Sequence, residues 1–502
     1  MRILFYNWVD YRDAEGRGGG VSLYQRNLIS ALDARGGVET AFLSAGLAHD
    51  LTRRTPHVVT LDAGPSPRYA LVNSGLIAPS HADFAGAAQL DHAATERAFA
   101  AFVDRTGPWD VIHFNNLEGL PAQVLSLRPR WPQTRFVLSL HNYYPFCPQV
   151  NLWFAERETC TDFHGGAKCA RCLPAPPQPR PVRLAYAFAW SLSRRGLGPG
   201  TVFYDRLFRP CMSHAWRLAR RVLTRRRGLE TPAPPPAIGH QPQGHSGEPF
   251  AQRRARMVAL INAHCDAVLC VSDRVRQIAL SHGIHAERLQ TRYIGSAEAA
   301  LWRTSQPRPR FLAPDGTLHL AYLGYMRRDK GFHFLMRALA ALPEPQAQRI
   351  RLTVAARAGD AEAMAGLAAL RPRLAEVRHV DGYTHADLPA LLADVALGIV
   401  PAQWEDNLPQ VALEMHARHI PLITSDRGGA QELGRAPGFV FRAEEAQDLH
   451  RVLRRVLEGA LQPADYWAHA RPPTGMAEHL DALLGIYAGD CTPARSRRTK
   501  SA

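Results

Sequence analysis

Two carboxylates stand at the ends of one short stretch of the chain, WEDNLPQVALE (Trp404 to Glu414). Asp406 and Glu414 are separated by seven residues, most of them apolar. Pro409 suits the first turn of a helix, so we expect Asp406 just before the helix or at its cap, and Glu414 in its second turn. A helix cap and a surface acid are the structural alternatives, although the neighbours of Glu414 are typical of a core.

Cations follow an earlier strand-like segment in the same half of the chain. The stretch GYMRRDKG (Gly324 to Gly331) offers Arg327, Arg328 and Lys330 directly before a helix-like run. Cations in such a place can neutralise a diphosphate, whereas a solvated charged turn is the structural alternative.

Glycine-rich turns follow two other strand-like segments. GRGGG (Gly16 to Gly20) comes after the first strand, and GGAQE (Gly428 to Glu432) comes after PLITSD. Glycine lets a backbone approach a phosphate, and the N-terminus of a following helix favours negative charge. A merely tight turn explains such a motif about equally well.

Two histidines lie on neighbouring strand-like segments of the first half. His141 ends RFVLSLH, and His113 lies within DVIHFNN. A single histidine at a strand end is usually structural, but two at one expected site favour a function.

Four of the eight cysteines lie close together: Cys147, Cys160, Cys169 and Cys172. Only the last two form a CxxC pair of the ligand type. A structural Zn²⁺ held by four thiolates is one hypothesis, and reduced cysteines in an ordered loop are the alternative. Disulfides are not expected in a reducing cytoplasm.

Short strand-like segments alternate with helix-like ones through both halves of the chain, which predicts an α/β protein with two doubly wound domains. We expect a first domain at 1–300, interrupted at about 145–250 by a Cys-rich and Arg-rich insertion, and a second at 313–465. A terminal packing helix at 466–490 and a disordered tail at 491–502 complete the prediction. Two such domains would face each other across a cleft at the carboxyl ends of their strands.

The net charge of +15 over 502 residues comes mostly from one segment. Between Arg180 and Arg227 there are twelve arginines and one acid, which together contribute +11. Such a segment suits anionic lipid headgroups, phosphate-bearing substrates or nucleic acid. HAWRLARRVLTRRR, residues 214–227, has apolar residues at helical spacing, so it predicts either a packing helix or a helix on a membrane surface.

No apolar run approaches the ~20 residues needed to cross a bilayer, and the start of the chain has no long apolar region. We therefore expect a cytoplasmic protein, associated with the inner face of the membrane if the arginine segment binds lipid.

Several of these stretches together resemble a known family. GRGGGVSLYQRNL, LSLHNYYPFC, DAVLCVSDRVRQIALSHGI, LGYMRRDKGFHFL and EDNLPQVALEMHARHIPLITSDRGGAQEL are similar to the retaining GT-B glycosyltransferases of family 4. The resemblance covers roughly residues 1–300 and 315–445, and the last stretch is its most specific part. It implies a GT-B fold and transfer of a sugar from a nucleotide to a hydroxyl with retention of the anomeric configuration.

The resemblance also implies roles for the carboxylates and cations. Glu414 would accept hydrogen bonds from the ribose hydroxyls, and Asp406 would hold hydroxyls of the donor sugar. Lys330 would bind the diphosphate, supported by Arg327 or Arg328, and would stabilise the charge that develops on the leaving group.

Other residues would line the same site in a member of this family. His141 would contact the transferred sugar, and Gly19 and Gly20 would close on the diphosphate. The amides of Asn407 and Leu408, and the pair Gly428 and Gly429, would line the sugar and phosphate site. Such enzymes need no catalytic metal, and a similar cysteine cluster in some members supports a structural feature.

Two departures from the family pattern leave an alternative open. The family commonly has arginine where this chain has Tyr325, and glutamate where it has Asp406. Glu405 stands next to Asp406, but its spacing to Glu414 is one residue too long. A non-catalytic relative that binds a sugar nucleotide or a glycan is therefore the second hypothesis.

The expected partners follow from the leading hypothesis. They are a UDP-, GDP- or ADP-linked sugar, a glycan or lipid-linked acceptor of cell-surface polysaccharide or glycoconjugate biosynthesis, and a membrane surface at Arg180–Arg227. We expect no nucleic-acid partner, because the arginine segment has few aromatic residues for base stacking and such a function leaves the second-half motifs unexplained.

Overall fold

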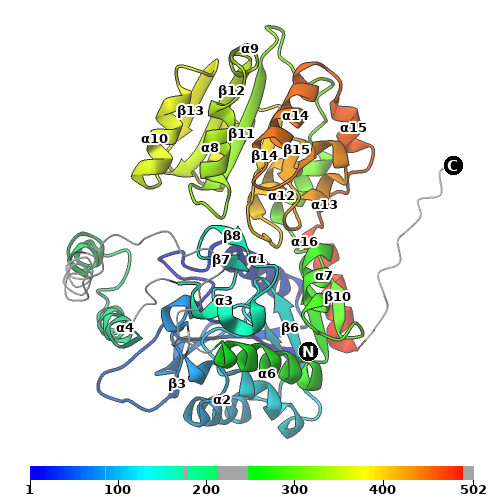
Figure 1. Cartoon of the computed structure of the whole chain (residues 1–502). Helices are drawn as coiled ribbons and strands as arrows, with labels where there is room; N and C mark the ends of the chain where they lie inside the picture. Colours follow the sequence, from blue (N-terminus) through cyan, green and yellow to red (C-terminus); the bar gives the residue numbers. More distant parts are fainter. Residues whose placement is uncertain (85, 174–178, 213, 215–246, 490–502) are drawn as a thin grey trace, which may run out of the picture. The chain divides into compact units, whose positions relative to one another are not determined.

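The computed structural model describes residues 1–84, 86–173, 179–212, 214 and 247–489, which form two compact units (Figure 1). The first unit comprises Met1–Ser139, Tyr143–Val150 and Thr161–Ala267, and the second comprises Leu140–Asn142, Asn151–Cys160 and Val268–Ala502. Most of the predicted helix at 214–227 and the predicted tail at 491–502 lie outside the described residues.

The first unit is built on β-strands with helices between them, as the alternation of apolar segments predicts. Its elements are β1 (Arg2–Asn7), α1 (Gly19–Arg35), β2 (Glu39–Ala45), β3 (His57–Asp62), β4 (Arg68–Val72), α2 (Ala93–Thr106), β5 (Val111–Phe114), β6 (Arg135–Leu140), α3 (Ala167–Ala170), α4 (Pro179–Ser193), η5 (Tyr204–Phe208) and α6 (Glu248–His264). Strands β1, β2, β4, β5 and β6 pair in parallel, and only β3 runs antiparallel to its neighbour β4.

The long C-terminal segment of the second unit starts with β9 (Ala267–Cys270), α7 (Asp273–Ser281) and β10 (Leu289–Thr291). The strands of the first unit stand in the order β6-β5-β1-β2-β4-β3, and in the second unit β10 pairs in parallel with β9. A hairpin of β7 (Trp153–Phe154) and β8 (Glu158–Thr159) also belongs to this unit.

A second, six-stranded sheet carries the rest of the second unit. Its strands and helices are β11 (Leu318–Tyr325), α8 (Phe332–Ala340), α9 (Glu344–Ala347), β12 (Ile350–Arg357), α10 (Ala361–Leu370), β13 (Glu376–Val380), α11 (Leu388–Leu392), β14 (Leu397–Val400), α12 (Gln410–His416), β15 (Leu422–Ser425), α13 (Gln431–Gly434), β16 (Val440–Phe441), α14 (Ala446–Leu457), α15 (Pro463–Trp467) and α16 (Met476–Ala488). The strand order is β13-β12-β11-β14-β15-β16, and all the pairings are parallel.

The order of this sheet reverses between β11 and β14, which lie side by side although about 70 residues separate them. Leu320 pairs with Leu397 and Ala321 with Gly398. Because both strands run in the same direction, the loop after β11 and the loop after β14 leave the sheet at one edge. In doubly wound sheets, such a reversal is where ligands bind.

The predicted α/β fold with parallel sheets is confirmed. The sequence prediction did not include β3, β4, β7, β8 or β16. Strand β3 is only partly buried and β16 has two residues, so neither carries the continuous apolar run that marks a buried strand. Among the described residues, no helix is long and apolar enough to cross a membrane.

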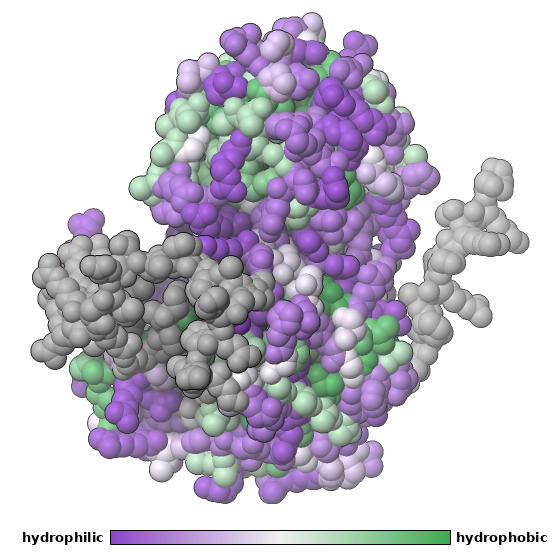
Figure 2. All heavy atoms as spheres, in the orientation of Figure 1, coloured by the Kyte–Doolittle hydropathy of each residue, from purple (hydrophilic) through white to green (hydrophobic). Residues whose placement is uncertain are grey.

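Hydrophilic residues cover most of the face drawn in Figure 2. Ten large apolar side chains of the described residues are exposed, and six of them lie between Leu184 and Leu207. The exposed apolar surface of the described chain is therefore concentrated in the arginine-rich segment.

The loop after β11 ends at Gly331, which has a left-handed backbone conformation with φ of 75°. A Cβ atom at this position would lie 1.7 Å from the carbonyl oxygen of Pro401, in the loop after β14. Glycine is therefore required both by the backbone angle and by the close approach of the two loops.

We expect Gly331→Ala to destabilise the protein far more than Gly316→Ala. Gly316 has a similar φ of 80°, but a Cβ there would have only Arg349 at 4.0 Å. Gly316→Ala should therefore cost only the left-handed penalty of about 1 kcal/mol in the free energy of unfolding. Chemical denaturation of both variants measures the difference, and equal losses would contradict the close approach.

Candidate functional site

Lys330 and Asp406 meet at the edge of the sheet where β11 and β14 end. Lys330 Nζ lies 2.6 Å from Asp406 Oδ2 and 5.0 Å from the centroid of the Trp404 ring. Asp406 is almost completely buried, and about a quarter of the Lys330 side chain is exposed. The structure thus brings together two of the residues that the sequence assigned to one site.

Gly428 and Gly429 pack directly against the main chain of the loop after β14. A Cβ at Gly428, whose φ is 70°, would lie 1.9 Å from the carbonyl oxygen of Asp406, and one at Gly429 would lie 2.3 Å from that of Asn407. The Gly429 N–H donates to the Asp406 carbonyl at 2.9 Å. These glycines therefore hold the loop, and their amides are used inside the protein.

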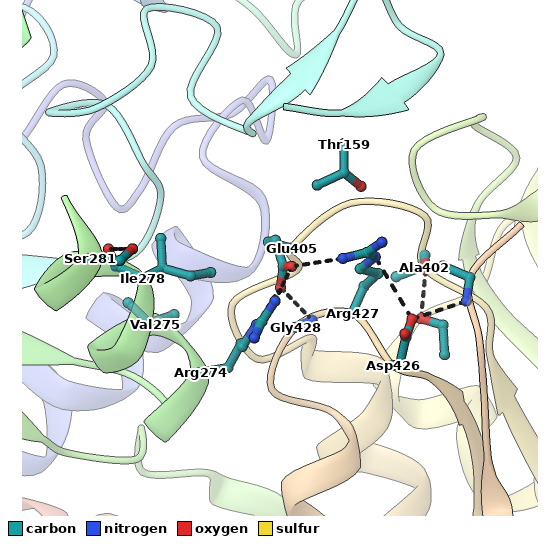
Figure 3. Close-up of polar contacts among 12 residues, drawn as sticks. Thr159, Arg274, Val275, Ile278, Ser281, Ala402, Glu405, Asp426, Arg427 and Gly428 are labelled. Atoms are coloured by element: carbon teal, nitrogen blue, oxygen red, sulfur yellow. Dashed lines mark hydrogen bonds and ion pairs between the residues drawn. The ribbon is translucent and has the colours of Figure 1, made fainter. Parts of the chain in front are cut away.

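Glu405, the neighbour of Asp406 in the sequence, points toward Arg274, Arg427 and Gly428 (Figure 3). Its carboxylate accepts from Arg274 at 2.8 and 2.5 Å, accepts the Gly428 N–H at 3.0 Å, and lies 3.5 Å from Arg427. Burial by itself would raise the pKa of Glu405, but the hydrogen bonds and charge of Arg274, the Gly428 N–H and the charge of Arg427 lower it overall.

Asn407 and Leu408 complete the buried part of this loop. The Asn407 side chain donates to the carbonyl of Leu140, also in the second unit, at 3.3 Å. Its Oδ1 atom is buried without a hydrogen-bond partner among the described residues, and Leu408 is buried. An unpaired buried acceptor of this kind is typical of a site that binds a donor group.

Glu414 lies in the second turn of α12, as predicted, and Pro409 is the N-cap rather than part of the first turn. The Glu414 carboxylate lies 2.9 Å from His385 Nε2, and its second oxygen, Oε2, is buried without a hydrogen-bond partner among the described residues. Burial raises the pKa of Glu414, the charge of His385 opposes this, and the charge of Glu298 adds to it. A buried, incompletely satisfied carboxylate is a candidate ligand-binding group.

The two arginines of the loop after β11 are paired within the second unit. Arg327 binds the carboxylate of Asp329 at 2.9 and 2.8 Å, and Arg328 pairs with Glu362. Tyr325, at the position where the family commonly has arginine, is 55% exposed. Both arginines that could replace the charge missing at Tyr325 are thus engaged in ion pairs.

His141 is partly buried in the second unit. Burial lowers the pKa of its ring to about 3, and nearby His479 acts in the same direction, so the ring is neutral near pH 7. Gly19 and Gly20 are the first residues of α1 and are exposed in the first unit. His113 is fully buried with Nε2 at 2.7 Å from Ser139 Oγ, which is a structural contact inside the sheet.

The structure does not support the zinc site that the cysteines suggested. No group of three or more His, Cys, Asp or Glu residues within the described part of the chain could hold a metal ion. The Cys172 thiol instead donates to Gln149 Oε1 at 2.9 Å, and none of the described cysteines forms a disulfide. The structure therefore gives no support to the metal site expected at Cys147, Cys160, Cys169 and Cys172.

Sequence reasoning missed several residues that shape the site. Trp404 and Glu405 were visible in the stretch that contains Asp406, but spacing alone assigned them no role. His385 and Arg274 had no signal, because both reach the site from loops or helices distant in the sequence. Glu432, in the GGAQE motif, accepts the N–H groups of Asp273 and Arg274 at the start of α7.

Several solved structures share the fold of this chain at low sequence identity. Sucrose-phosphate synthase from Thermosynechococcus elongatus has a TM-score of 0.54 at 15% identity, covering 97% of this chain and 100% of that one. HepE from Anabaena, in complex with UDP and glucose, has a TM-score of 0.52 at 14% identity, with coverage of 97% and 99%. The α,α-trehalose-phosphate synthase (UDP-forming) from Burkholderia vietnamiensis has a TM-score of 0.53 at 12% identity, covering 97% of this chain and 99% of that one.

These likenesses show that the fold is of the GT-B class. Residues 317–459, which run from β11 to α14, match the family model described as Glycosyl transferases group 1. No curated protein matches the chain. The fold and the matched region together support a GT-B glycosyltransferase.

We expect Glu414→Gln to raise the melting temperature at pH 7. The folded pKa of Glu414 lies above the usual value of about 4.3, so ionisation of this buried carboxyl costs stability as pH rises through the folded pKa. The gain in melting temperature of the variant should shrink toward zero as the pH falls to the pKa of a glutamate in the unfolded chain, about 4.3. Exposed Glu344→Gln is the control, and a difference that is constant with pH would contradict the raised pKa.

Proposed function

We propose that the protein is a retaining glycosyltransferase that moves a sugar from a nucleotide-sugar donor to a hydroxyl of a glycan or lipid-linked acceptor. The observation that carries this proposal is the 2.6 Å pair of Lys330 and Asp406 at the edge where the sheet order reverses. This pair lies in the region that matches Glycosyl transferases group 1. Cell-surface polysaccharide or glycoconjugate biosynthesis in the cytoplasm is the proposed setting.

In this proposal, Lys330 binds the diphosphate of the donor and Asp406 binds hydroxyls of its sugar. A diphosphate carries more negative charge than one carboxylate, so it competes for Lys330 and leaves Asp406 oxygens to accept sugar hydroxyls. Lys330 then stabilises the charge that develops on the leaving diphosphate. Glu414 accepts hydrogen bonds from the ribose through its unpartnered Oε2 atom.

The other predicted residues support these groups. Arg327 and Arg328 supply positive charge beside the diphosphate, and His141 contacts the transferred sugar as a neutral ring. The backbone of Asn407 and Leu408, held by Gly428 and Gly429, lines the donor site. Gly19 and Gly20 act on the diphosphate from a first, acceptor-side domain at 1–300, and residues 313–465 form the donor domain. No step of this proposal uses a metal.

The structures of HepE were determined with UDP, and with UDP-glucose, so UDP-sugars are the first donors to test. GDP- and ADP-sugars are the alternatives.

A second candidate is a non-catalytic relative that binds a sugar nucleotide or a glycan without turnover. Exposed Tyr325, in the place of the family's arginine, favours this candidate, because a charge that would stabilise the leaving diphosphate is missing there.

We expect one class of nucleotide sugar to raise the melting temperature and to be hydrolysed or transferred. Glu414→Ala should weaken donor binding because it removes the ribose acceptor, and Lys330→Met should reduce turnover by about 100-fold or more because it removes the cation at the leaving group. Asp315→Asn, which breaks an exposed ion pair with Arg351 in the same unit, is the matched control.

Binding without any turnover would establish the non-catalytic candidate. If none of the UDP-, GDP- and ADP-sugars binds at millimolar concentration, the donor site itself is contradicted.

We also propose that the arginine segment Arg180–Arg227 places the protein on an anionic membrane surface. In its described part, Leu184 and Phe188 on α4 are 47% and 46% exposed, and Val202 is 72% exposed. The opposite face of α4 is anchored, since Tyr186 donates to the Ala78 carbonyl at 3.1 Å. Exposed apolar side chains among arginines suit a surface where acyl chains lie beneath anionic headgroups.

We expect Arg194→Glu with Arg195→Glu to reduce binding to vesicles that contain phosphatidylglycerol by about tenfold or more, because each arginine near such a surface contributes about 1 kcal/mol. Co-sedimentation measures the binding. Arg53→Glu with Arg54→Glu, an exposed pair in the same unit, is the control. Equal losses in both variants, or equal binding to purely phosphatidylcholine vesicles, would count against this surface.

A further inference from the structure

Of the two acids in the loop after β14, Glu405 has more positively charged and hydrogen-bonding partners than Asp406. Its side chain is 5% exposed, and its carboxylate accepts from the Nε and Nη2 atoms of Arg274 and from the Gly428 N–H and pairs with Arg427 (Figure 3). A two-point contact between an arginine and a carboxylate constrains direction as well as distance. Glu405 is therefore held in one orientation, and its oxygens are occupied by the protein.

The neighbouring acid, Asp406, is held by a different cation. Glu405 binds Arg274, whereas Asp406 binds Lys330 at 2.6 Å. Between these two side chains, the carbonyl of Asp406 accepts the Gly429 N–H. The loop at Asp406 is thus held by two side chains and by one main-chain hydrogen bond.

Arg274 lies on an anchored element. It is in the first turn of α7, where the N–H groups of Asp273 and Arg274 donate to Glu432 at 2.9 and 2.7 Å. The Tyr293 hydroxyl donates to the same carboxylate at 2.6 Å. The loop after β14 and helix α13 therefore each place one glutamate against the same turn of α7.

We propose that Glu405 is a positioning residue that orients Asp406 toward the donor by tying its loop to α7 through Arg274. The proposal rests on the donor role proposed above for Asp406. Because the Glu405 carboxylate is buried and already occupied, Glu405 acts through the loop and does not contact the donor itself. Asp406, its neighbour in the sequence, then binds the donor sugar.

The test compares Glu405→Gln and Arg274→Leu with Arg274→Lys, which keeps the charge without the fork. Asp315→Asn is the control, because its pair with Arg351 has a similar distance of 2.5 Å but is exposed and lies before β11. The first readout is hydrogen exchange of the peptides that cover residues 402–409 and 426–431. The second is kcat/KM for the donor, together with the KM for the acceptor.

In Glu405→Gln we expect the Gly429 amide, whose acceptor is the Asp406 carbonyl, to exchange about tenfold faster. Donor kcat/KM should fall by about tenfold or more with an unchanged acceptor KM, because misplacement of a binding group acts on the donor step alone. Arg274→Leu should lower donor kcat/KM as Glu405→Gln does, whereas Arg274→Lys should retain more activity. The double variant Glu405→Gln with Arg274→Leu should have a donor kcat/KM no lower than that of Arg274→Leu, because both changes remove the same interaction.

Unchanged exchange at Gly429 in Glu405→Gln would overturn the inference, and so would a lower melting temperature with unchanged donor kcat/KM. A wild-type protein that binds no nucleotide sugar would instead contradict the proposed function. In that case the exchange measurement still decides whether Glu405 orients the loop.

Discussion

The close approach of two main-chain segments is the constraint on which the site depends. Gly428 and Gly429 lie so near the carbonyl groups of Asp406 and Asn407 that a Cβ atom at either glycine would overlap them. This contact joins the loops after β14 and β15, so a side chain from one can be fixed by the other. A glycine with φ of 70° provides the backbone conformation that the approach needs.

The number of charged and hydrogen-bonding partners differs between the acids of the site, and this difference indicates which acids stabilise the structure and which are available to a ligand. Glu405 has two arginines and an N–H group, and its pKa is lowered in spite of burial. Glu414 has one histidine and a second oxygen without a partner among the described residues, and its pKa is raised. A carboxylate whose contacts are complete stabilises the structure, whereas one with an unused buried oxygen can gain binding energy from a ligand.

The alternation of apolar segments predicted the parallel sheets because β11, β12, β14 and β15 are each buried along most of their length. The motif spacing also placed Glu414 correctly in the second turn of α12. Gly428 and Gly429 were predicted as groups that bind the donor, but the Gly428 amide donates to Glu405 and that of Gly429 to Asp406. A glycine motif indicates that the main chain approaches another group closely. It does not indicate whether that group is a phosphate of a ligand or another loop of the protein.

The sequence by itself determined the succession of strands and helices, since burial periodicity is a local property, and it determined which loops carry acids, cations and glycines. Only the tertiary structure decided which cation each acid meets. Glu405 and Asp406 are adjacent and chemically similar, so no local pattern distinguishes them. Glu405 binds Arg274, 131 residues away on α7, and Asp406 binds Lys330, 76 residues away in the loop after β11. The pairing of β11 with β14 brings Lys330 to Asp406, and the packing of α7 brings Arg274 to Glu405, and neither is a local property of the sequence.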